Sequence, residues 1–156
     1  MNDFCAVLPA PTFAIGVRCD DASIREIVYL PPSAALKPLC APAREAVRQL
    51  AAYLADPRFK FSLPLAPAGT PFQRRVWQAI AAIPAGQTQS YGALAQVLGS
   101  GARAVGQACG ANPYPLVIPC HRVVAAGGAL GGFAHRRGGF LLDVKRWLLA
   151  HEGARF

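Results

Sequence analysis

Proline and glycine divide this chain into short segments, and this limits the folds open to it. The 14 prolines and 15 glycines among 156 residues follow no regular period, which excludes a collagen-like repeat. Because proline ends helices and is not tolerated in central strands, we expect short elements joined by turns. Hydrophobic residues make up 53% of the chain and charged residues 15%, so the chain can bury a core and is not disordered. The length suits one domain or two small lobes.

Positive charge concentrates in the second part of the chain. The formal net charge is +8 and the isoelectric point is about 9.8. Residues 1–70 hold seven basic and six acidic side chains, whereas residues 71–156 hold nine basic and two acidic ones. Such a field favours a polyanionic partner, with nucleic acid before an anionic membrane surface. The alternative is a charge that serves only solubility.

The five cysteines favour a reducing compartment. Their number is odd, their spacing is irregular and no Cys-x-x-Cys occurs, which argues against a disulfide framework. All three histidines come late in the chain, so Cys5, Cys19 and Cys40 have no imidazole nearby in the sequence and we expect no metal site. The uncharged stretches 4–17 and 104–120 are short and broken by prolines, so neither is expected to span a membrane. We therefore expect a cytoplasmic protein with no membrane partner.

The first 68 residues predict a small structural α/β lobe. Residues 13–17 and 24–30 form apolar runs on either side of an Asp-Asp turn, which is typical of two short strands. Residues 43–54 place apolar side chains three to four positions apart, as one face of a helix does. The proline-rich stretch 63–69 suits a linker. No cluster of polar residues converges in this lobe.

The chain after residue 68 predicts a mainly helical lobe. Thr70 suits the N-cap of a helix over residues 72–83, because a proline follows it at the first helical position. Helices over 91–98 and 102–110 are joined by a Gly-Ser-Gly turn. A helix pair with a glycine turn in a basic lobe is a helix-turn-helix candidate, although most such pairs only pack together.

The segment 102–110 carries unusually small side chains. Apart from Arg103 and Gln107, it contains only alanine, glycine, valine and cysteine. Its glycines lower its intrinsic helix stability. A thin helix of this kind fits the narrow minor groove of DNA, and it equally fits close packing against a neighbouring helix. Sequence alone leaves both explanations open.

Cys120 lies in the most informative segment of the sequence. It follows a predicted buried strand at 116–118 and precedes a His-Arg pair, whose positive charge is expected to lower the pKa of the thiol. The thiolate is the nucleophilic form of cysteine. A histidine base needs an orienting acceptor, and the second lobe holds only two carboxylates, Asp143 in a predicted helix over about 140–151 and Glu152 just after it.

Residues 119–123, Pro-Cys-His-Arg-Val, resemble the active-site signature of the O6-alkylguanine-DNA alkyltransferases, also called methylated-DNA–protein-cysteine methyltransferases. Further motifs resemble that family in the same order, at residues 69–73, 76–77, 83–88, 90–92, 102–106, 112–113 and 147–153. The resemblance covers residues 69–153 with one disturbed stretch, whereas the first lobe resembles the family only in outline. It implies an α/β two-lobe fold, in which residues 1–68 form an RNase H-like lobe and residues 69–156 form a DNA-binding and alkyl-acceptor lobe with a helix-turn-helix.

The resemblance implies direct repair of alkylated DNA. Such proteins flip an O6-alkylguanine, or less readily an O4-alkylthymine, out of duplex DNA through the minor groove and transfer its alkyl group to an internal cysteine. Arg103 is implied to fill the place of the flipped nucleotide. The thioether product cannot release the group, so each molecule acts once as a self-inactivating methyltransferase. No cofactor is expected because the damaged DNA donates the group, and the implied partner is lesion-bearing double-stranded DNA, bound by a monomer.

The resemblance also assigns roles to individual residues. Cys120 is the alkyl acceptor, His121 acts through a water as its base, and Glu152 orients His121. Asn112 holds the turn before the active-site segment, and Tyr91 contacts the base or the rotating phosphate. The expected DNA contacts are Tyr91, Ala102, Arg103, Ala104, Gly106, Gln107 and Arg122, and the expected walls of the substrate pocket are Cys109, Phe133 and Ala134.

The sequence departs from the family pattern after the signature. Phe133 stands where the family has a tyrosine, and Ala134 where some members have serine, so two hydroxyl groups near the base are missing. The segment is also longer than in the family. It carries His135, Arg136 and Arg137 between glycines, and these basic residues are expected to face DNA or solvent.

Two other functions compete with alkyl transfer. A protein that only recognises alkylated bases lacks the acceptor, so the presence of Cys120 argues against it. A thiol hydrolase needs an oxyanion hole and a histidine from elsewhere in the chain, such as His151. It would leave the basic lobe without a purpose.

Overall fold

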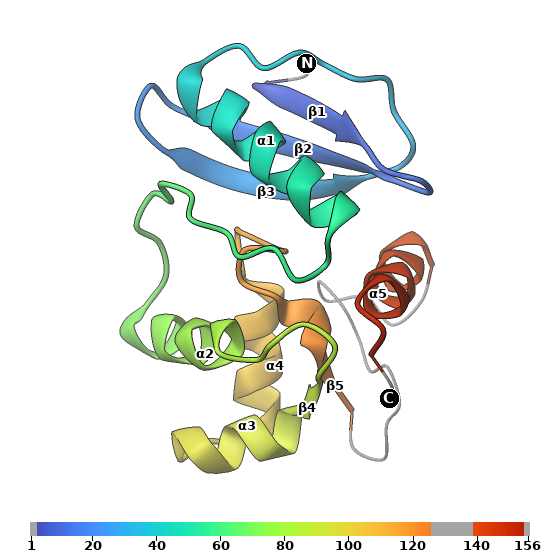
Figure 1. Ribbon diagram of the computed structural model, residues 1–156. Coiled ribbons are helices and arrows are strands. Elements are labelled where there is room, and N and C mark those ends of the chain that lie inside the picture. Colours follow the sequence, from blue (N-terminus) through green and yellow to red (C-terminus); the bar gives the residue numbers. More distant parts are fainter. Residues whose placement is uncertain (1–2, 126–138, 155–156) are drawn as a thin grey trace. The chain divides into compact units, whose positions relative to one another are not determined.

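The computed structural model describes residues 3–125 and 139–154 and divides the chain into two compact units, Met1–Pro67 and Ala68–Phe156 (Figure 1). The first unit is an antiparallel sheet in the order β1-β2-β3, formed by β1 (Ala6–Pro9), β2 (Ala14–Cys19) and β3 (Ile24–Leu30). Strands β2 and β3 confirm the two predicted apolar runs. Strand β1 was not predicted, because prolines lie at its end and beyond it. An edge strand tolerates proline there, since its outer N–H groups need no partner.

Helix α1 (Ala41–Ala55) lies across one face of this sheet (Figure 1). It confirms the predicted helix over 43–54 and begins slightly earlier. Its buried side includes Ala46, Leu50 and Tyr53, spaced at helical intervals, and the helix contacts all three strands of the sheet. Residues 63–67 of the predicted linker also belong to this unit, where Ala66 N–H donates to the Ile24 carbonyl at 2.8 Å.

The second unit is mainly helical. It contains α2 (Pro71–Ala81), α3 (Tyr91–Leu98), α4 (Ala102–Gly110) and α5 (Phe140–His151). The last three confirm the predicted ranges. The other helices and strands among the described residues of this unit are two short parallel strands, β4 (Gln89–Ser90) and β5 (Val123–Val124), and one 3-10 turn (Cys120–Arg122).

Local sequence signals explain where these helices begin and end. Thr70 and Gln73 form a capping box at α2, with Thr70 Oγ1 accepting from Gln73 N at 3.1 Å and Gln73 Oε1 accepting from Thr70 N at 2.9 Å. Ser90 caps α3 through a 3.0 Å bond from Ala93 N. Gly99, with a φ of 65°, ends α3 in the left-handed conformation, so the chain turns at once into α4.

The predicted strand at 116–118 is wrong. This segment forms tight turns with a single bridge between Pro115 and Ile118, and Leu116 has a φ of 75°. Prolines on both sides deny a strand its backbone donors. Instead, Ile118 N–H donates to the Tyr114 carbonyl at 2.9 Å and Cys120 N–H donates to the Ile118 carbonyl at 2.8 Å. The compact turn, not a strand, therefore positions Cys120.

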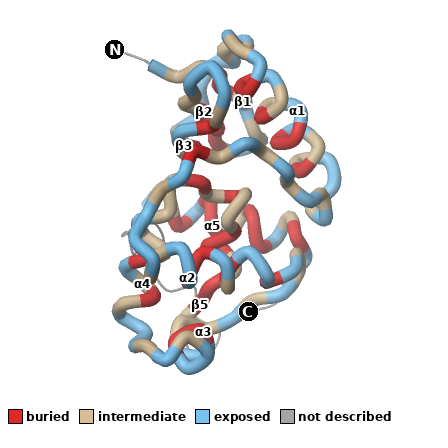
Figure 2. The backbone as a smooth tube through the Cα atoms, turned by 90° about the vertical axis from the view of Figure 1, so that its left-hand side faces the viewer, coloured by how far each residue is buried: buried red, intermediate tan, exposed pale blue. Residues whose placement is uncertain are grey.

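Apolar side chains from several segments form the interior of the second unit. Val76 and Ile80 of α2, Val105 of α4 and Leu148 of α5 are fully buried, and buried positions alternate with exposed ones along these helices (Figure 2). The Trp77 indole N–H donates to the Ala108 carbonyl of α4 at 2.8 Å, which ties α2 to α4. Among the described residues, no helix is both long and apolar enough to cross a membrane.

Gly69→Ala is expected to destabilise the protein by about 2 kcal/mol or more. Gly69 has a φ of +86°, and a Cβ there would lie 2.6 Å from ring atoms of Trp77. The matched control is Gly92→Ala, since Gly92 lies in α3, a Cβ there would meet no atom closer than 4.0 Å, and alanine favours the helix. Denaturant unfolding measures both variants. Equal effects of the two substitutions would contradict the packing argument.

Candidate active site

Cys120 begins the 3-10 turn and is 4% exposed. The Asn112 side chain holds both the turn and the thiol, because its Nδ2 donates to the Ile118 carbonyl at 2.9 Å and to Cys120 Sγ at 3.2 Å. Its Oδ1 accepts from Tyr114 N at 2.8 Å. One amide thus connects the end of α4 to the thiol, in the turn where the sequence predicted a holding role for Asn112.

The thiol of Cys120 is neutral at rest. Its hydrogen bond with the Cys109 thiol raises the pKa of Cys120 well above the ordinary value, and burial raises it further. The bond from Asn112 and the charge of Lys145 act in the opposite direction and are outweighed. The expectation of a lowered pKa is therefore wrong for the resting protein. The positive charge of Arg122, which supported that expectation, is neutralised by another partner.

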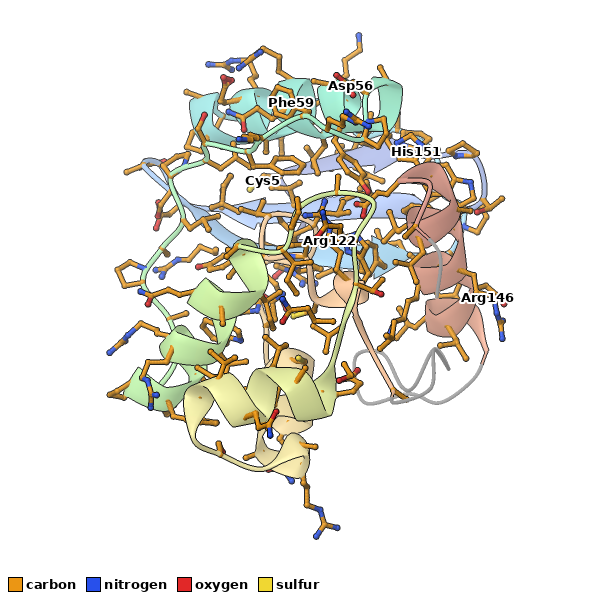
Figure 3. The ribbon with its side chains drawn as sticks, turned by 60° about the horizontal axis from the view of Figure 1, so that its bottom comes forward. Cys5, Asp56, Phe59, Arg122, Arg146 and His151 are labelled. Atoms are coloured by element: carbon orange, nitrogen blue, oxygen red, sulfur yellow. The ribbon has the colours of Figure 1, made fainter. Side chains whose placement is uncertain are left out.

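That partner is Glu152, a buried carboxylate shared by two side chains. His121 Nε2 lies 2.7 Å from Glu152 Oε2. Arg122 donates from Nε to Oε1 and from Nη2 to Oε2, both at 2.9 Å, in a two-pronged contact. Arg122 Nη1 also donates to the Ile83 carbonyl at 2.7 Å. The network joins the 3-10 turn to the end of α5 and to the segment after α2, with Arg122 inside the second unit (Figure 3).

This network fixes the chemistry of His121. A carboxylate only accepts, so the Nε2 atom carries the proton and Nδ1 carries the basic lone pair. Nδ1 is buried and has no hydrogen-bond partner among the described residues. Burial lowers the pKa of His121, although Glu152 opposes this, so the ring is neutral near pH 7. His121 is therefore a neutral imidazole base that directly follows Cys120 in the sequence.

Lys145 is a residue of this site that the sequence analysis missed. Its side chain is fully buried, its Nζ donates to the Val123 carbonyl at 2.8 Å, and Nζ lies 5.9 Å from the centre of the Tyr91 ring. Burial lowers the pKa of Lys145 to about 8, while the Cys109 and Cys120 thiols oppose that shift. The signal was available in principle, because Lys145 interrupts the apolar face of α5 between Leu142 and Leu149.

Helix α4 presents different side chains on its two sides. Val105 and Ala108 point inward and are buried. The residues predicted to contact DNA lie elsewhere on α4: Ala102, Arg103 and Gln107 are exposed, and Ala104 and Gly106 are half-buried. Arg122, predicted to be among the DNA contacts, lies instead in the buried network with Glu152, with 11% of its side chain exposed.

Tyr91 and Cys109 both lie near Cys120, because each affects the titration of a neighbouring group in this cluster. A Cβ at Gly106 would lie 4.0 Å from the Tyr91 ring, so the start of α3 and the middle of α4 are in contact. Burial raises the pKa of Tyr91, and the thiols of Cys109 and Cys120 add to this effect, so its phenol is neutral. The predicted pocket residues Phe133 and Ala134, like His135, Arg136 and Arg137, lie outside the described residues.

Comparison with known proteins gives the site a context. A family model described as 6-O-methylguanine DNA methyltransferase, DNA binding domain, matches residues 71–154. A methylated-DNA–protein-cysteine methyltransferase of Methanosarcina acetivorans is 46% identical over 113 residues, which are 71% of this chain and 69% of that protein. One from Salmonella typhimurium is 55% identical over 94 residues, 59% of this chain and 52% of that protein. In the regulatory protein ada of the same organism, the matching segment spans 35% of the protein at 46% identity and 83% of this chain.

Solved structures share the fold. Mycobacterium tuberculosis OGT in complex with DNA has a TM-score of 0.78 at 35% identity, covering 94% of this chain and 91% of that one. The O6-methylguanine-DNA methyltransferase of Pyrococcus kodakaraensis has a TM-score of 0.63 at 25% identity, covering 95% and 98%. The sequence matches span about one third to two thirds of the curated relatives, whereas the structural matches extend over nearly the whole chain.

Substituting Lys145 tests the cost of its burial. Between pH of about 8 and 10.5 the unfolded chain holds a proton on Lys145 that the folded chain has lost, so the free energy of unfolding of the native protein should rise with pH in this range. Lys145→Met is expected to raise that free energy near pH 7 by about 1–3 kcal/mol, with a gain that shrinks toward pH 10.5. Denaturant unfolding at several pH values measures this. A gain that stays constant with pH would contradict a buried, depressed lysine.

Proposed function

This chain belongs to the 6-O-methylguanine DNA methyltransferase family, and we propose that it repairs duplex DNA by transferring the alkyl group of O6-alkylguanine to Cys120. One observation within the family-matched segment carries this proposal. The buried thiol of Cys120 directly precedes His121, whose Nε2 lies 2.7 Å from Glu152 Oε2. Thymine alkylated at O4 is a slower substrate in this proposal. The protein acts as a monomer, and no bound cofactor takes part.

The proposed reaction is an in-line displacement at the alkyl carbon. A bridging water passes the Cys120 proton to His121 Nδ1, and Glu152 stabilises the imidazolium that forms. The sulfur–carbon bond forms as the carbon–O6 bond breaks, and the guanine leaves as an anion that takes up a proton. The product is a thioether, which has no leaving group under these conditions, so each molecule reacts once.

Because the resting thiol of Cys120 is neutral, Lys145 has a role in stabilising the thiolate in this proposal. Because Cys109 and burial hold Cys120 protonated, the thiolate needs a nearby positive charge when it forms. Lys145 supplies that charge from inside the unit, and its effect on Cys120 favours the ionised form. Lys145→Met is therefore expected to slow alkyl transfer even though it stabilises the fold. Arg122 acts as a positioning residue, because it donates a hydrogen bond to each oxygen of the Glu152 carboxylate and so fixes its orientation.

We propose that α3 and α4 form a helix-turn-helix that enters the minor groove. Supporting this, the exposed side of α4 carries only small side chains apart from Arg103 and Gln107, so a backbone can approach it closely. Arg103 is exposed near the start of α4, where its guanidinium can enter the base stack and fill the space of the flipped nucleotide. Arg74 and Arg75 of α2 are also exposed and suit phosphate contacts. The first unit, with its sheet covered by α1, is proposed to be the RNase H-like structural lobe.

Cys120→Ser is expected to abolish alkyl uptake while duplex binding persists, because a serine hydroxyl is far less nucleophilic than a thiolate. After incubation with an O6-methylguanine duplex, intact-mass spectrometry should show one added CH2 per wild-type chain and none on the variant. Cys40→Ser is the matched control and should react like the wild type. Methyl uptake by Cys120→Ser would contradict the proposal. An unmodified wild type would favour a binding protein, and turnover of a test ester would favour a hydrolase.

Arg103→Ala should slow repair of duplex DNA at least about tenfold more than reaction with free O6-benzylguanine, since the free base has no stack to leave. Arg146→Ala serves as the control, because Arg146 is exposed on α5, points outward and pairs only with Asp143 at 3.1 Å among the described residues (Figure 3). Single-turnover kinetics on both substrates measure the ratio. Equal slowing of both reactions by Arg103→Ala would show that Arg103 serves the fold and not nucleotide flipping.

A further inference from the structure

Three cysteines that are far apart in the sequence meet in the first unit. Cys5 precedes β1, Cys19 ends β2 and Cys40 is the N-cap residue of α1. Their sulfur atoms all lie within 4.8 Å of one another, and Cys19 Sγ and Cys40 Sγ are 2.8 Å apart. Figure 3 marks Cys5 at the sheet of this unit. None of the three takes part in the proposed alkyl transfer.

The fold, and not chance side-chain rotation, holds these thiols together. The start of β1 lies beside the end of β2 because the strands are antiparallel, with Cys5 N–H donating to the Val17 carbonyl at 2.7 Å. The chain before α1 returns to the same place, since Leu39 N–H donates to the Cys5 carbonyl at 3.0 Å. Cys5 Sγ contacts the Cys19 carbonyl at 3.4 Å. Each thiol is therefore attached to backbone that hydrogen bonds fix.

The spacing suits a covalent bond better than a shared metal ion. Two thiolates on one zinc ion, at a Zn–S distance of about 2.3 Å and tetrahedral angles, lie about 3.8 Å apart. Cys19 Sγ and Cys40 Sγ are already closer, at 2.8 Å. A disulfide needs about 2.05 Å, so the two sulfurs have less far to move to form a bond than they would have to separate around zinc. All three cysteines are partly exposed, so small reagents reach them.

We propose that Cys19 and Cys40 form a reversible disulfide, with a low-molecular-weight disulfide such as oxidised glutathione as the oxidant. The Cys40 thiolate attacks one sulfur of the oxidant and releases one glutathione thiolate, which takes up a proton from water. The Cys19 thiol then loses its proton to water and attacks Cys40 Sγ of the mixed disulfide, which releases the second. Two protein thiols are oxidised by two electrons and one disulfide is reduced to two thiols.

The order of these steps follows from the surroundings of each thiol. Burial raises the pKa of Cys19, and the neighbouring thiols of Cys40 and Cys5 raise it further, so Cys19 is the poorer first attacker. Cys40 stands at the start of α1, where its side chain makes no capping bond and is partly exposed, so a small disulfide can reach it. Cys5, within 4.8 Å of both, is the thiol that can reopen the bond by exchange.

The bond would staple the end of β2 to the start of α1 across a separation of 21 residues. Closing a loop of this size restricts the unfolded chain, so the oxidised protein should be the more stable form. The expected increase in Tm is about 5 °C or more. Cys120 and Cys109 should remain reduced at the same glutathione ratio, because Cys120 is buried and a small disulfide does not reach its sulfur.

The test equilibrates the full chain in glutathione buffers of increasing oxidised fraction, followed by acid quench, thiol alkylation and peptide mass mapping. Cleavage after Arg18 and Arg25 places Cys19 and Cys40 in separate peptides. We expect a loss of two hydrogens per chain, a cross-linked peptide pair containing Cys19 and Cys40, and unchanged methyl uptake from an O6-methylguanine duplex. Thermal unfolding of the oxidised form should show the increase in Tm.

Two variants make the result decisive. Cys40→Ser should fold, because serine is a good N-cap, and it should show neither the cross-link nor the increase in Tm. Cys109→Ser should retain both. The proposal is overturned if no cross-link forms in excess oxidised glutathione, if the cross-link joins Cys109 to Cys120, or if native mass spectrometry shows the three thiols holding zinc that prevents oxidation. Methyl uptake at Cys120, measured separately on the reduced chain, tests alkyl transfer, so the two proposals fail independently.

Discussion

The second unit depends on the hydrogen bonds that the buried carboxylate of Glu152 accepts from Arg122 and His121. Glu152 accepts two hydrogen bonds from Arg122 and one from His121, its side chain is fully buried, and its position just after α5 brings the end of that helix to the 3-10 turn. A buried ion of this kind is tolerated only when its oxygens are fully satisfied. Removing any one member leaves a charge or a polar atom uncompensated, so the His-Arg pair and the glutamate constrain one another.

The sequence analysis assumed that a positive charge close to Cys120 in the chain also favours its thiolate, and the network around Glu152 explains why this assumption fails. Arg122 stands two positions after Cys120, and its charge was expected to favour the thiolate. In the structure that charge is committed to Glu152, and the Cys109 thiol together with burial keeps Cys120 protonated. A resting thiol is inert toward chance electrophiles. In this account the proton leaves only along the path through His121, and the positive charge that meets the thiolate comes from Lys145.

The fold was largely predictable, and the reasons differ from element to element. Helices α3, α4 and α5 were predicted with their observed bounds because Ser90, Gly99 and the apolar periodicity of α5 are local signals. Strand β1 was missed because only its pairing with β2 makes it a strand. The turn before Cys120 was mistaken for a strand because residues 116–118 have the apolar composition of a buried strand, although only Leu116 of the three is buried. Local sequence does not reveal the φ of 75° at Leu116, inside the turn that the Ile118 N–H closes onto the Tyr114 carbonyl.

The site was predictable where a motif carries it and not where burial does. Cys120, His121 and Glu152 were named from the resemblance to the family, whereas Lys145 was missed because its position in the sequence does not by itself show that its side chain is buried. In the proposed reaction the Glu152 carboxylate makes His121 the base for Cys120, and single-turnover kinetics of Glu152→Gln with free O6-benzylguanine test this most directly. Glutamine keeps the shape but not the charge, so a variant shown by circular dichroism to be folded should react at least about 100-fold more slowly than the wild type. A folded variant that reacts at the wild-type rate would contradict the account.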